Sequence, residues 1–134
     1  ESWTTRFGAD VCVHTTLFPK IPEAWRNDAL AEKWDKIRGY RSGITSAIES
    51  WRRDKTIGSS LQAEAIISPE GQTLLNDLDL WADICITSSA VPGLYIGAAV
   101  APGEKCERCW RVLPEVGTNA KHPTLCIRCC EAVA

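Results

Sequence analysis

Hydrophobic residues recur along residues 30–51 at intervals of three and four, with a single gap of seven. This spacing places them on one face of an α-helix, so the segment predicts a long amphipathic helix. Asn27 or Asp28 can cap its start, because a short polar side chain there accepts free backbone N–H groups. Gly58 is expected to end the helix. The apolar stripe consists of Leu30, Trp34, Ile37, Ile44, Ile48 and Trp51.

Two glycines interrupt this helical pattern. Gly39 and Gly43 lower the helix propensity locally, which favours a kink or a close packing contact at that point. Upstream of the helix, Phe18-Pro19 and Ile21-Pro22 predict an extended lead-in, because a residue that precedes proline disfavours the helical conformation.

Residues 61–100 combine strand and helix patterns. Ser68 and Pro69 mark a helix start, with the serine as cap and the proline at the first helical position. We expect a βαββ unit in which one helix covers a small sheet. Its predicted elements are a strand at 61–67, a helix through Leu74, Leu75 and Leu78, and strands at 84–87 and 94–100.

Cysteines dominate the last thirty residues. The pairs Cys106-x-x-Cys109 and Cys126-x-x-Cys129 are separated by sixteen residues. Two such pairs at this separation are typical of a structural zinc site with four thiolate ligands. The total of seven cysteines is odd, which argues against a framework made only of disulfides. We therefore predict one structural Zn²⁺ bound by these four residues.

Two alternative ligands stay open in the sequence. Cys130 directly follows Cys129 and could replace it, and His122 lies between the pairs and could complete a three-cysteine, one-histidine site. The equal spacing of the two pairs favours Cys129. Cys12 and Cys85 lie in apolar stretches and are expected to be buried thiols rather than ligands.

These patterns predict an α+β protein of three parts. Residues 1–58 form a helical region, residues 59–103 a small α/β subdomain, and residues 104–134 a ribbon-like zinc-knuckle module. The chain has 134 residues, begins with Glu-Ser and contains no methionine, so we expect a piece of a longer protein. It shows neither a hydrophobic leader nor an apolar run of membrane-spanning length, and we expect no membrane contact and a cytoplasmic location.

Charge is segregated along the chain. Eight of the fifteen basic residues lie between Arg26 and Lys55, and five more lie between Lys105 and Arg128. Residues 56–104 contain six acidic residues and no Lys or Arg. Blocks of like charge are often only solvent-exposed surface without a binding role. The alternative is that both basic blocks line one polyanion.

Two groups of motifs resemble one family. The first is Lys105-Cys-Glu-Arg-Cys-Trp110 with Val116-Gly117 and Leu125-Cys-Ile-Arg-Cys129. It resembles the C-terminal zinc finger of bacterial-type isoleucyl-tRNA synthetases, a finger type that also occurs in DNA glycosylases of the formamidopyrimidine family. The second group is similar to the end of the synthetases' anticodon-binding region, and so favours the synthetases. It comprises His14, Phe18-Pro19, Trp34, Arg41, Ala47-Ile-Glu49, Arg52, the run Lys55–Ala63 and Ile84–Ser88.

The resemblance implies a fragment that binds isoleucine tRNA by its anticodon arm and positions it for aminoacylation by an upstream catalytic core. It also implies a monomer that contacts the upstream synthetase domains of the same polypeptide. The sequence shows no Gly-rich phosphate loop, nucleophile elbow or His/carboxylate pair, so this part alone is expected to have no catalytic site. The expected RNA contacts are Lys105, Arg108, Trp110, Arg111, Arg128, Arg52 and Arg53.

Other interpretations remain at this point. Trp110 either stacks on an unpaired base or covers the zinc site. The whole chain could instead be a stand-alone zinc module that binds DNA or RNA, as in a glycosylase tail. A third alternative is an interaction domain without any nucleic-acid partner.

Overall fold

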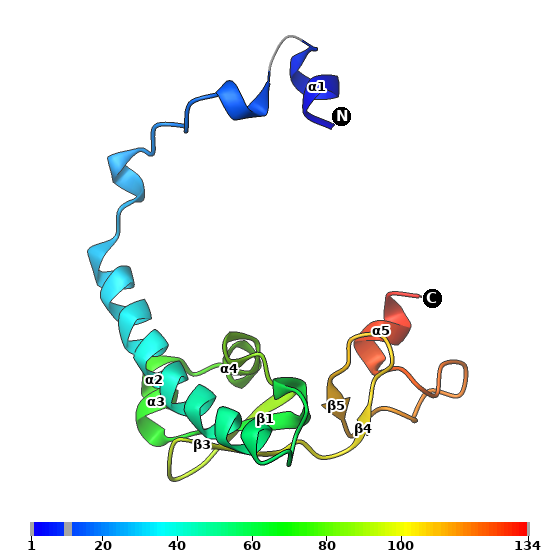
Figure 1. Cartoon of the computed structure of the whole chain (residues 1–134). Coiled ribbons are helices and arrows are strands. Elements are labelled where there is room, and N and C mark those ends of the chain that lie inside the picture. Colours follow the sequence, from blue (N-terminus) through cyan, green and yellow to red (C-terminus); the bar gives the residue numbers. More distant parts are fainter. Residues whose placement is uncertain (1, 10–11, 134) are drawn as a thin grey trace.

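The computed structural model describes residues 2–9 and 12–133 and has the predicted α+β architecture. A thin N-terminal arm leads into one long helix, which lies against a small sheet, and a cysteine-rich finger follows (Figure 1). The α-helices are α1 (Ser2–Phe7), α2 (Asp28–Arg53), α3 (Pro69–Leu74), α4 (Leu78–Cys85) and α5 (Ile127–Glu131). The strands are β1 (Ala63–Ile67), β2 (Ser89–Pro92), β3 (Gly97–Val100), β4 (Glu104–Lys105) and β5 (Val112–Leu113). Among the described residues, three short 3₁₀ helices span Val13–Thr15, Glu23–Trp25 and Ser60–Gln62.

The predicted amphipathic helix is α2. Asn27 caps it, since its side chain accepts a hydrogen bond of 2.9 Å from the Leu30 N–H. Ile37, Ile44 and Ile48 from the predicted stripe are buried. The helix is continuous through both glycines. A Cβ on Gly43 would lie 3.3 Å from Ile96, which fits the expected close packing, whereas Gly39 faces open space.

The expected end of α2 at Gly58 is wrong. The helix ends at Arg53, and Lys55 adopts the left-handed conformation with φ of 59°. The Thr56 N–H then bonds the Trp51 carbonyl at 2.9 Å, and the Lys55 N–H bonds the Arg52 carbonyl at 3.2 Å. This pair of hydrogen bonds is a Schellman motif, which satisfies the last carbonyls of the helix. It was not predicted because lysine rarely occupies that position.

Residues 63–100 form one three-stranded sheet. β1 is central, with β2 parallel to it on one side and β3 antiparallel on the other. The strands expected at 61–67 and 94–100 are therefore present in shortened form, and α3 begins at Pro69 as predicted. Ser68 occupies the cap position, but its hydroxyl makes no capping hydrogen bond and donates to Glu70 instead.

The strand expected at 84–87 is wrong, and so is the single covering helix. The chain forms two helices, because Asp77 caps a new one by accepting from the Leu80 N–H at 2.9 Å. That helix, α4, runs through Cys85 and buries Trp81, Ala82 and Cys85. It ends with Ile86 in the left-handed conformation, φ 56°. The unit is therefore β1-α3-α4-β2-β3 rather than βαββ.

The hydrophobic core joins α2 to this unit. Isoleucines of α2 pack with β1 and α4, and Arg41 of α2 donates a 2.7 Å hydrogen bond to the Ile84 carbonyl. A second, smaller core lies in the finger. It consists of Cys106, Val116, Cys126 and Cys129, with Cys109, Leu113 and Leu125 packed around it.

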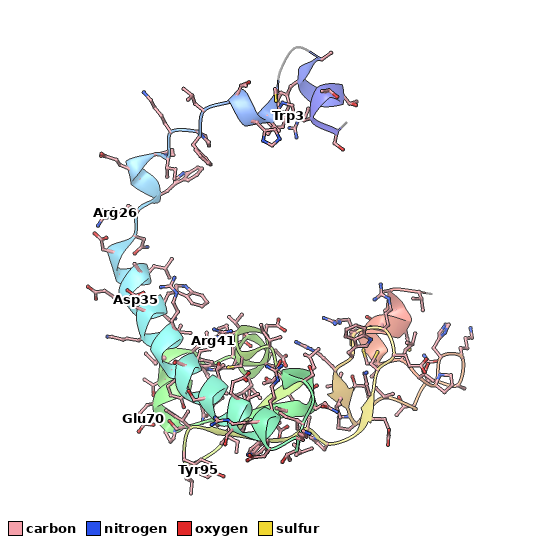
Figure 2. All side chains as sticks on the ribbon, in the orientation of Figure 1. Trp3, Arg26, Asp35, Arg41, Glu70 and Tyr95 are labelled. Carbon is pink, nitrogen blue, oxygen red and sulfur yellow. The ribbon has the colours of Figure 1, made fainter. Side chains whose placement is uncertain are left out.

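The N-terminal arm, residues 2–9 and 12–27, extends away from the sheet and the finger (Figure 2) and carries exposed apolar side chains. Phe18 is 99% exposed, and Leu17, Ile21 and Trp25 are also exposed. The extended lead-in around the prolines is as predicted, apart from one 3₁₀ turn at Glu23–Trp25. Cys12 is exposed, so its expected burial is wrong, whereas Cys85 is buried as expected. Within residues 2–9 and 12–133, no helix combines the length and apolarity that crossing a membrane requires.

Candidate metal centre and nucleic-acid interface

Four cysteines meet in the finger, and they are the four predicted from the spacing. Two knuckles, Cys106–Cys109 and Cys126–Cys129, face each other so that all four sulfurs lie within 4.8 Å of one another. The sulfurs of Cys109 and Cys126 are 3.7 Å apart. A tetrahedral Zn²⁺ with Zn–S bonds of about 2.3 Å requires S–S distances of about 3.8 Å. The cluster therefore fits zinc in donor type, number and spacing.

Backbone hydrogen bonds and burial act in opposite directions on the ionisation of these sulfurs. Burial alone raises the pKa of Cys106, but hydrogen bonds from backbone N–H groups of Cys109, Cys126 and Arg108 outweigh it and lower that pKa. Burial raises the pKa of Cys126, and the neighbouring thiols add to the increase. Zinc would stabilise all four thiolates together, because a divalent cation at the centre compensates their charge.

The two alternative ligands lie outside the sulfur cluster. Cys130 is buried, but its thiol lies 3.8 Å from the Leu125 carbonyl and 3.9 Å from the His122 carbonyl. His122 is not part of the group formed by the four cysteines of the knuckles. The choice of Cys129 as the fourth zinc ligand stays a prediction that this geometry favours.

Arginines connect the two knuckles. Nη1 of Arg108, in the first knuckle, lies 3.7 Å from the sulfur of Cys129 in the second. Arg128, in the second knuckle, lies beside Cys109 in the first, whose sulfur raises the pKa of the guanidinium by hydrogen bonding and charge. Each arginine immediately precedes the last cysteine of its own knuckle and contacts the last cysteine of the other. Positive charge is thus held against sulfurs that carry negative charge when ionised.

Arg111 has an intramolecular partner as well. Its guanidinium forms an ion pair with Asp83 of α4. All three arginines were expected to contact RNA, and each has a partner within the protein: Arg108 contacts Cys129, Arg111 pairs with Asp83, and Arg128 lies beside Cys109. Arg108 and Arg128 remain exposed, so a sulfur contact and a phosphate contact are compatible for these two side chains.

Trp110 lies at the surface rather than over the cysteines. Its side chain is 61% exposed and is absent from the small core of the finger. The ammonium of Lys105 lies 5.5 Å from the ring centroid, within the range of a cation–π contact. Lys105 and Trp110 line a hollow of about 250 Å³ together with Gly58, Ser59 and Gln62. The ring is therefore available for stacking.

A second, larger hollow adjoins the first. It has a volume of about 530 Å³ and is lined by Glu49, Arg52, Arg53, Lys55, Ile57 and Gly58. Gly58 lines both hollows, so the end of α2 and the first knuckle form one continuous surface. We name this the α2–finger surface and define it by Arg52, Arg53, Lys55, Lys105 and Trp110. Lys55 was not among the expected RNA contacts, although its place just after a basic helix end is a signal that could have found it.

Comparison with known proteins finds relatives of the finger and of the whole chain. The family described as "Zinc finger found in FPG and IleRS" matches residues 103–132. Relatives match far beyond these residues. The isoleucine–tRNA ligase of Gluconobacter oxydans is 44% identical over 144 residues, which cover 100% of this chain. The isoleucine–tRNA ligases of Caulobacter vibrioides and Geobacter sulfurreducens are 38% and 36% identical and cover 100% and 90% of the chain.

The chain is homologous to the C-terminal region of isoleucine–tRNA ligases. The resemblance stated from the motifs is therefore confirmed. The chain spans only 15–16% of the length of these relatives. A likeness limited to the finger would not distinguish the ligases from other proteins with that finger. The isoleucine–tRNA ligase likeness extends instead through α2 and the sheet.

Proposed function

We propose that this chain binds the anticodon arm of isoleucine tRNA and positions the tRNA for aminoacylation by an upstream catalytic core. The observation that carries the proposal is the α2–finger surface. It combines four basic side chains, which suit phosphates, with one exposed aromatic ring, which suits an unpaired base. The isoleucine–tRNA ligase homologues make isoleucine tRNA the appropriate polyanion to test.

The geometry supports separate roles for the residues of this surface. Arg53 and Lys55 would contact phosphates from the end of α2, and Lys105 would add a contact from the finger. Arg52 would contribute beside them, although it also pairs with Glu49 at 2.7 Å. Trp110 would stack on a base. Arg108 and Arg128 keep their expected RNA contacts in this proposal as secondary ones, because each also contacts a cysteine sulfur. Arg111 was expected to contact RNA as well, but its guanidinium is paired with Asp83.

A single zinc ion is part of the proposal. Cys106, Cys109, Cys126 and Cys129 would hold it with no open coordination position, so its role is structural. It would fix the two knuckles and with them Lys105 and Trp110. Few apolar residues lie in the finger, and a metal centre supplies the stability that so small a core lacks.

The exposed N-terminal arm supports the expected contact with upstream synthetase domains. Its apolar residues Leu17, Phe18, Ile21 and Trp25 are exposed, and the relatives are several times longer than this chain. We infer that other synthetase domains of the same polypeptide pack on this arm. A cytoplasmic location and a monomeric state stay predictions.

A stand-alone DNA- or RNA-binding finger is the weaker alternative. It explains the match at residues 103–132, but it does not explain the isoleucine–tRNA ligase match through the helical and sheet regions.

The experiment compares charging with amino-acid activation in the full-length protein. Trp110→Ala and Lys105→Ala should weaken isoleucine tRNA binding, by roughly tenfold for Trp110→Ala if one base stacks on the ring. Formation of isoleucyl-adenylate should be unchanged, because that step does not involve tRNA. Lys121→Ala is the matched control, since it removes the same charge from another part of the finger, beside a different hollow. Normal charging in both test variants, or an equal loss of adenylate formation, would contradict the proposal.

A further inference from the structure

We propose that Ser88, Asp83 and Arg111 form a clasp that docks the finger on the α/β unit and so positions Lys105 and Trp110 beside the end of α2. This inference rests on the proposed function, since it explains how the two halves of the α2–finger surface are kept together. Ser88 and Asp83 belong to the acidic middle of the chain, to which nothing above assigns a role in tRNA binding.

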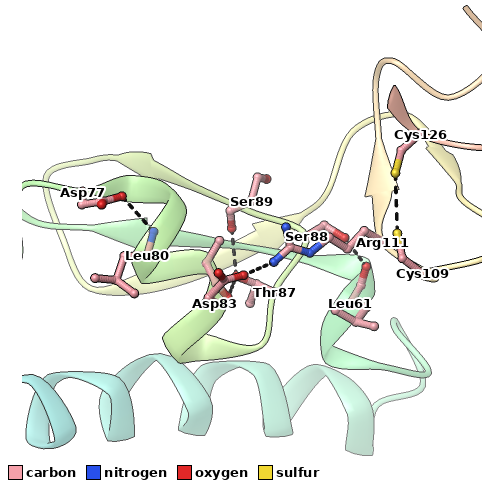
Figure 3. A network of polar contacts seen from close by, with 11 residues as sticks. Leu61, Asp77, Leu80, Asp83, Thr87, Ser88, Ser89, Cys109, Arg111 and Cys126 are labelled. Carbon is pink, nitrogen blue, oxygen red and sulfur yellow. Dashed lines mark hydrogen bonds and ion pairs between the residues drawn. The ribbon is translucent and has the colours of Figure 1, made fainter. Parts of the chain in front are cut away.

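Ser88 is the buried half of the clasp. It lies between α4 and β2 and is only 3% exposed. Its hydroxyl donates to the Leu61 carbonyl at 2.5 Å and accepts from the Val112 N–H of β5 at 2.6 Å. One side chain thus bridges the 3₁₀ helix before β1 and the finger (Figure 3). Removing the hydroxyl would leave two partly buried backbone groups without this partner, which is costly.

The ion pair between Arg111 and Asp83 is the second half of the clasp. The Arg111 side chain is 23% exposed and that of Asp83 is 64% exposed. Figure 3 shows the guanidinium reaching from the finger to α4 beside Ser88. The backbone of Arg111 is anchored in the first knuckle, because its carbonyl accepts a 2.8 Å bond from the Cys106 N–H. The ion pair therefore holds the first knuckle at a fixed position relative to α4.

The clasp acts next to the residues that it would position. Arg111 and Val112 directly follow Trp110, whose backbone has φ of 67° and whose N–H bonds the Cys106 carbonyl at 2.9 Å. On the opposite side of the hollow, Oε1 of Gln62 accepts from the Gly58 N–H at 2.6 Å and the Ser59 N–H at 3.2 Å. The Gln62 carbonyl also accepts from the Ala101 N–H at 2.9 Å, just before the finger begins. Both walls of the Trp110 hollow are thus fixed relative to each other.

A fixed position of the finger strengthens binding to a polyanion because both groups of contacts can then form together. When two groups of contacts are held in register, the second forms intramolecularly at high effective concentration. If the finger pivots, only a fraction of molecules presents both groups together, and the apparent affinity falls by that fraction.

The clasp and a direct RNA contact by Arg111 predict opposite effects for Asp83. Removing a carboxylate near a polyanion site raises the affinity by electrostatics, and it would also release Arg111 to bind phosphate. Under the clasp, the same change weakens binding because the finger loses its docking contact. The sign of the effect therefore distinguishes the two roles.

The test measures isoleucine tRNA affinity and amide hydrogen exchange in the full-length protein. Asp83→Ala should weaken tRNA binding about threefold, as expected for a partly exposed ion pair, and Asp83→Glu should retain the affinity. Ser88→Ala should weaken it by roughly tenfold and speed exchange in the peptide covering residues 104–113. Ser89→Ala is the matched control, because the Ser89 hydroxyl bonds Glu64 at 2.7 Å within the sheet and does not reach the finger. Zinc content and melting temperature of each variant show whether the finger itself remains folded.

The outcomes separate this inference from the proposed function. Unchanged or tighter tRNA binding in Asp83→Ala, with Lys105→Ala and Trp110→Ala weakened, overturns the clasp and leaves the proposed function intact. If Lys105→Ala and Trp110→Ala bind tRNA normally, the proposed function fails, and hydrogen exchange then decides the docking. Faster exchange at 104–113 in Ser88→Ala but not in Ser89→Ala supports the docking, and equal exchange in both overturns it. A Ser88→Ala variant that loses zinc is replaced in this comparison by Asp83→Ala, which is more exposed.

Discussion

The guanidinium of Arg108 lies 3.7 Å from the sulfur of Cys129, across the gap between the two knuckles. Groups that contact a metal ligand in this way typically alter metal affinity about 10- to 100-fold when removed. We predict that Arg108→Ala weakens zinc binding by about tenfold, measured by competition with a chromophoric chelator. Lys121→Ala, with the same loss of charge in the same finger, should bind zinc normally. Equal zinc affinity in both variants would show that Arg108 does not support the metal site.

Adjacent cysteines give a direct test of the ligand set. Cys129 belongs to the four-sulfur cluster, whereas the Cys130 thiol lies near backbone carbonyls. Elemental analysis should find one zinc per chain in the unmodified protein and in Cys130→Ser. Cys129→Ser should lose stoichiometric zinc, because a serine hydroxyl is a poor substitute for a thiolate. Zinc retained in Cys129→Ser but lost in Cys130→Ser would reverse the assignment.

Removal of the metal should unfold only the finger. Its core is built largely from the four cysteines, whereas α2 and the sheet share a separate apolar core. A strong chelator should therefore abolish amide protection from about residue 104 onward and leave most of the helical circular dichroism. Protection at Ala63–Ile67 serves as the internal control. If the knuckle amides remain protected in the chelated protein, the fold of the finger does not depend on metal.

Two glycines should respond to alanine in opposite directions. A Cβ on Gly103 would lie 2.3 Å from the Leu113 carbonyl carbon, and Gly103 has φ of 105°. Gly103→Ala should therefore destabilise the finger by at least about 1–3 kcal/mol. Gly39→Ala faces open space on α2 and should stabilise the protein by roughly 0.5–1 kcal/mol. Thermal unfolding of both variants measures the effects, and a loss of stability in Gly39→Ala would contradict the helix geometry described for α2.

Local patterns predicted the parts of the fold that depend on local chemistry. The stripe Ile37, Ile44 and Ile48 and the cap Asn27 specified α2 because helix periodicity and capping involve neighbouring residues. The cysteine spacing located the sulfur cluster for the same reason. Ile84 and Cys85 were mistaken for strand, since a short run of β-branched and apolar residues does not distinguish a strand from a buried helix end.

Tertiary pairing could not be predicted from these patterns. The charge blocks indicated a basic surface, but nothing in the sequence indicated that Arg111 would pair with Asp83 or that Arg108 would reach Cys129. Such partners are far apart in the sequence and depend on how the finger docks. The hydroxyl of Ser88 is a similar case, because its two hydrogen bonds join Leu61 and Val112 from distant elements.

The most direct test of the account is the salt dependence of isoleucine tRNA binding by the full-length protein. The triple variant Arg52→Ala, Arg53→Ala and Lys105→Ala removes three cations from the α2–finger surface. The control variant Lys33→Ala, Lys36→Ala and Lys121→Ala removes the same charge from residues that line other hollows. Each lost phosphate contact lowers the slope of log affinity against log salt by about 0.7–0.9. We predict a slope reduced by about two to three in the first variant and an unchanged slope in the control. Equal slopes in the two variants would contradict it.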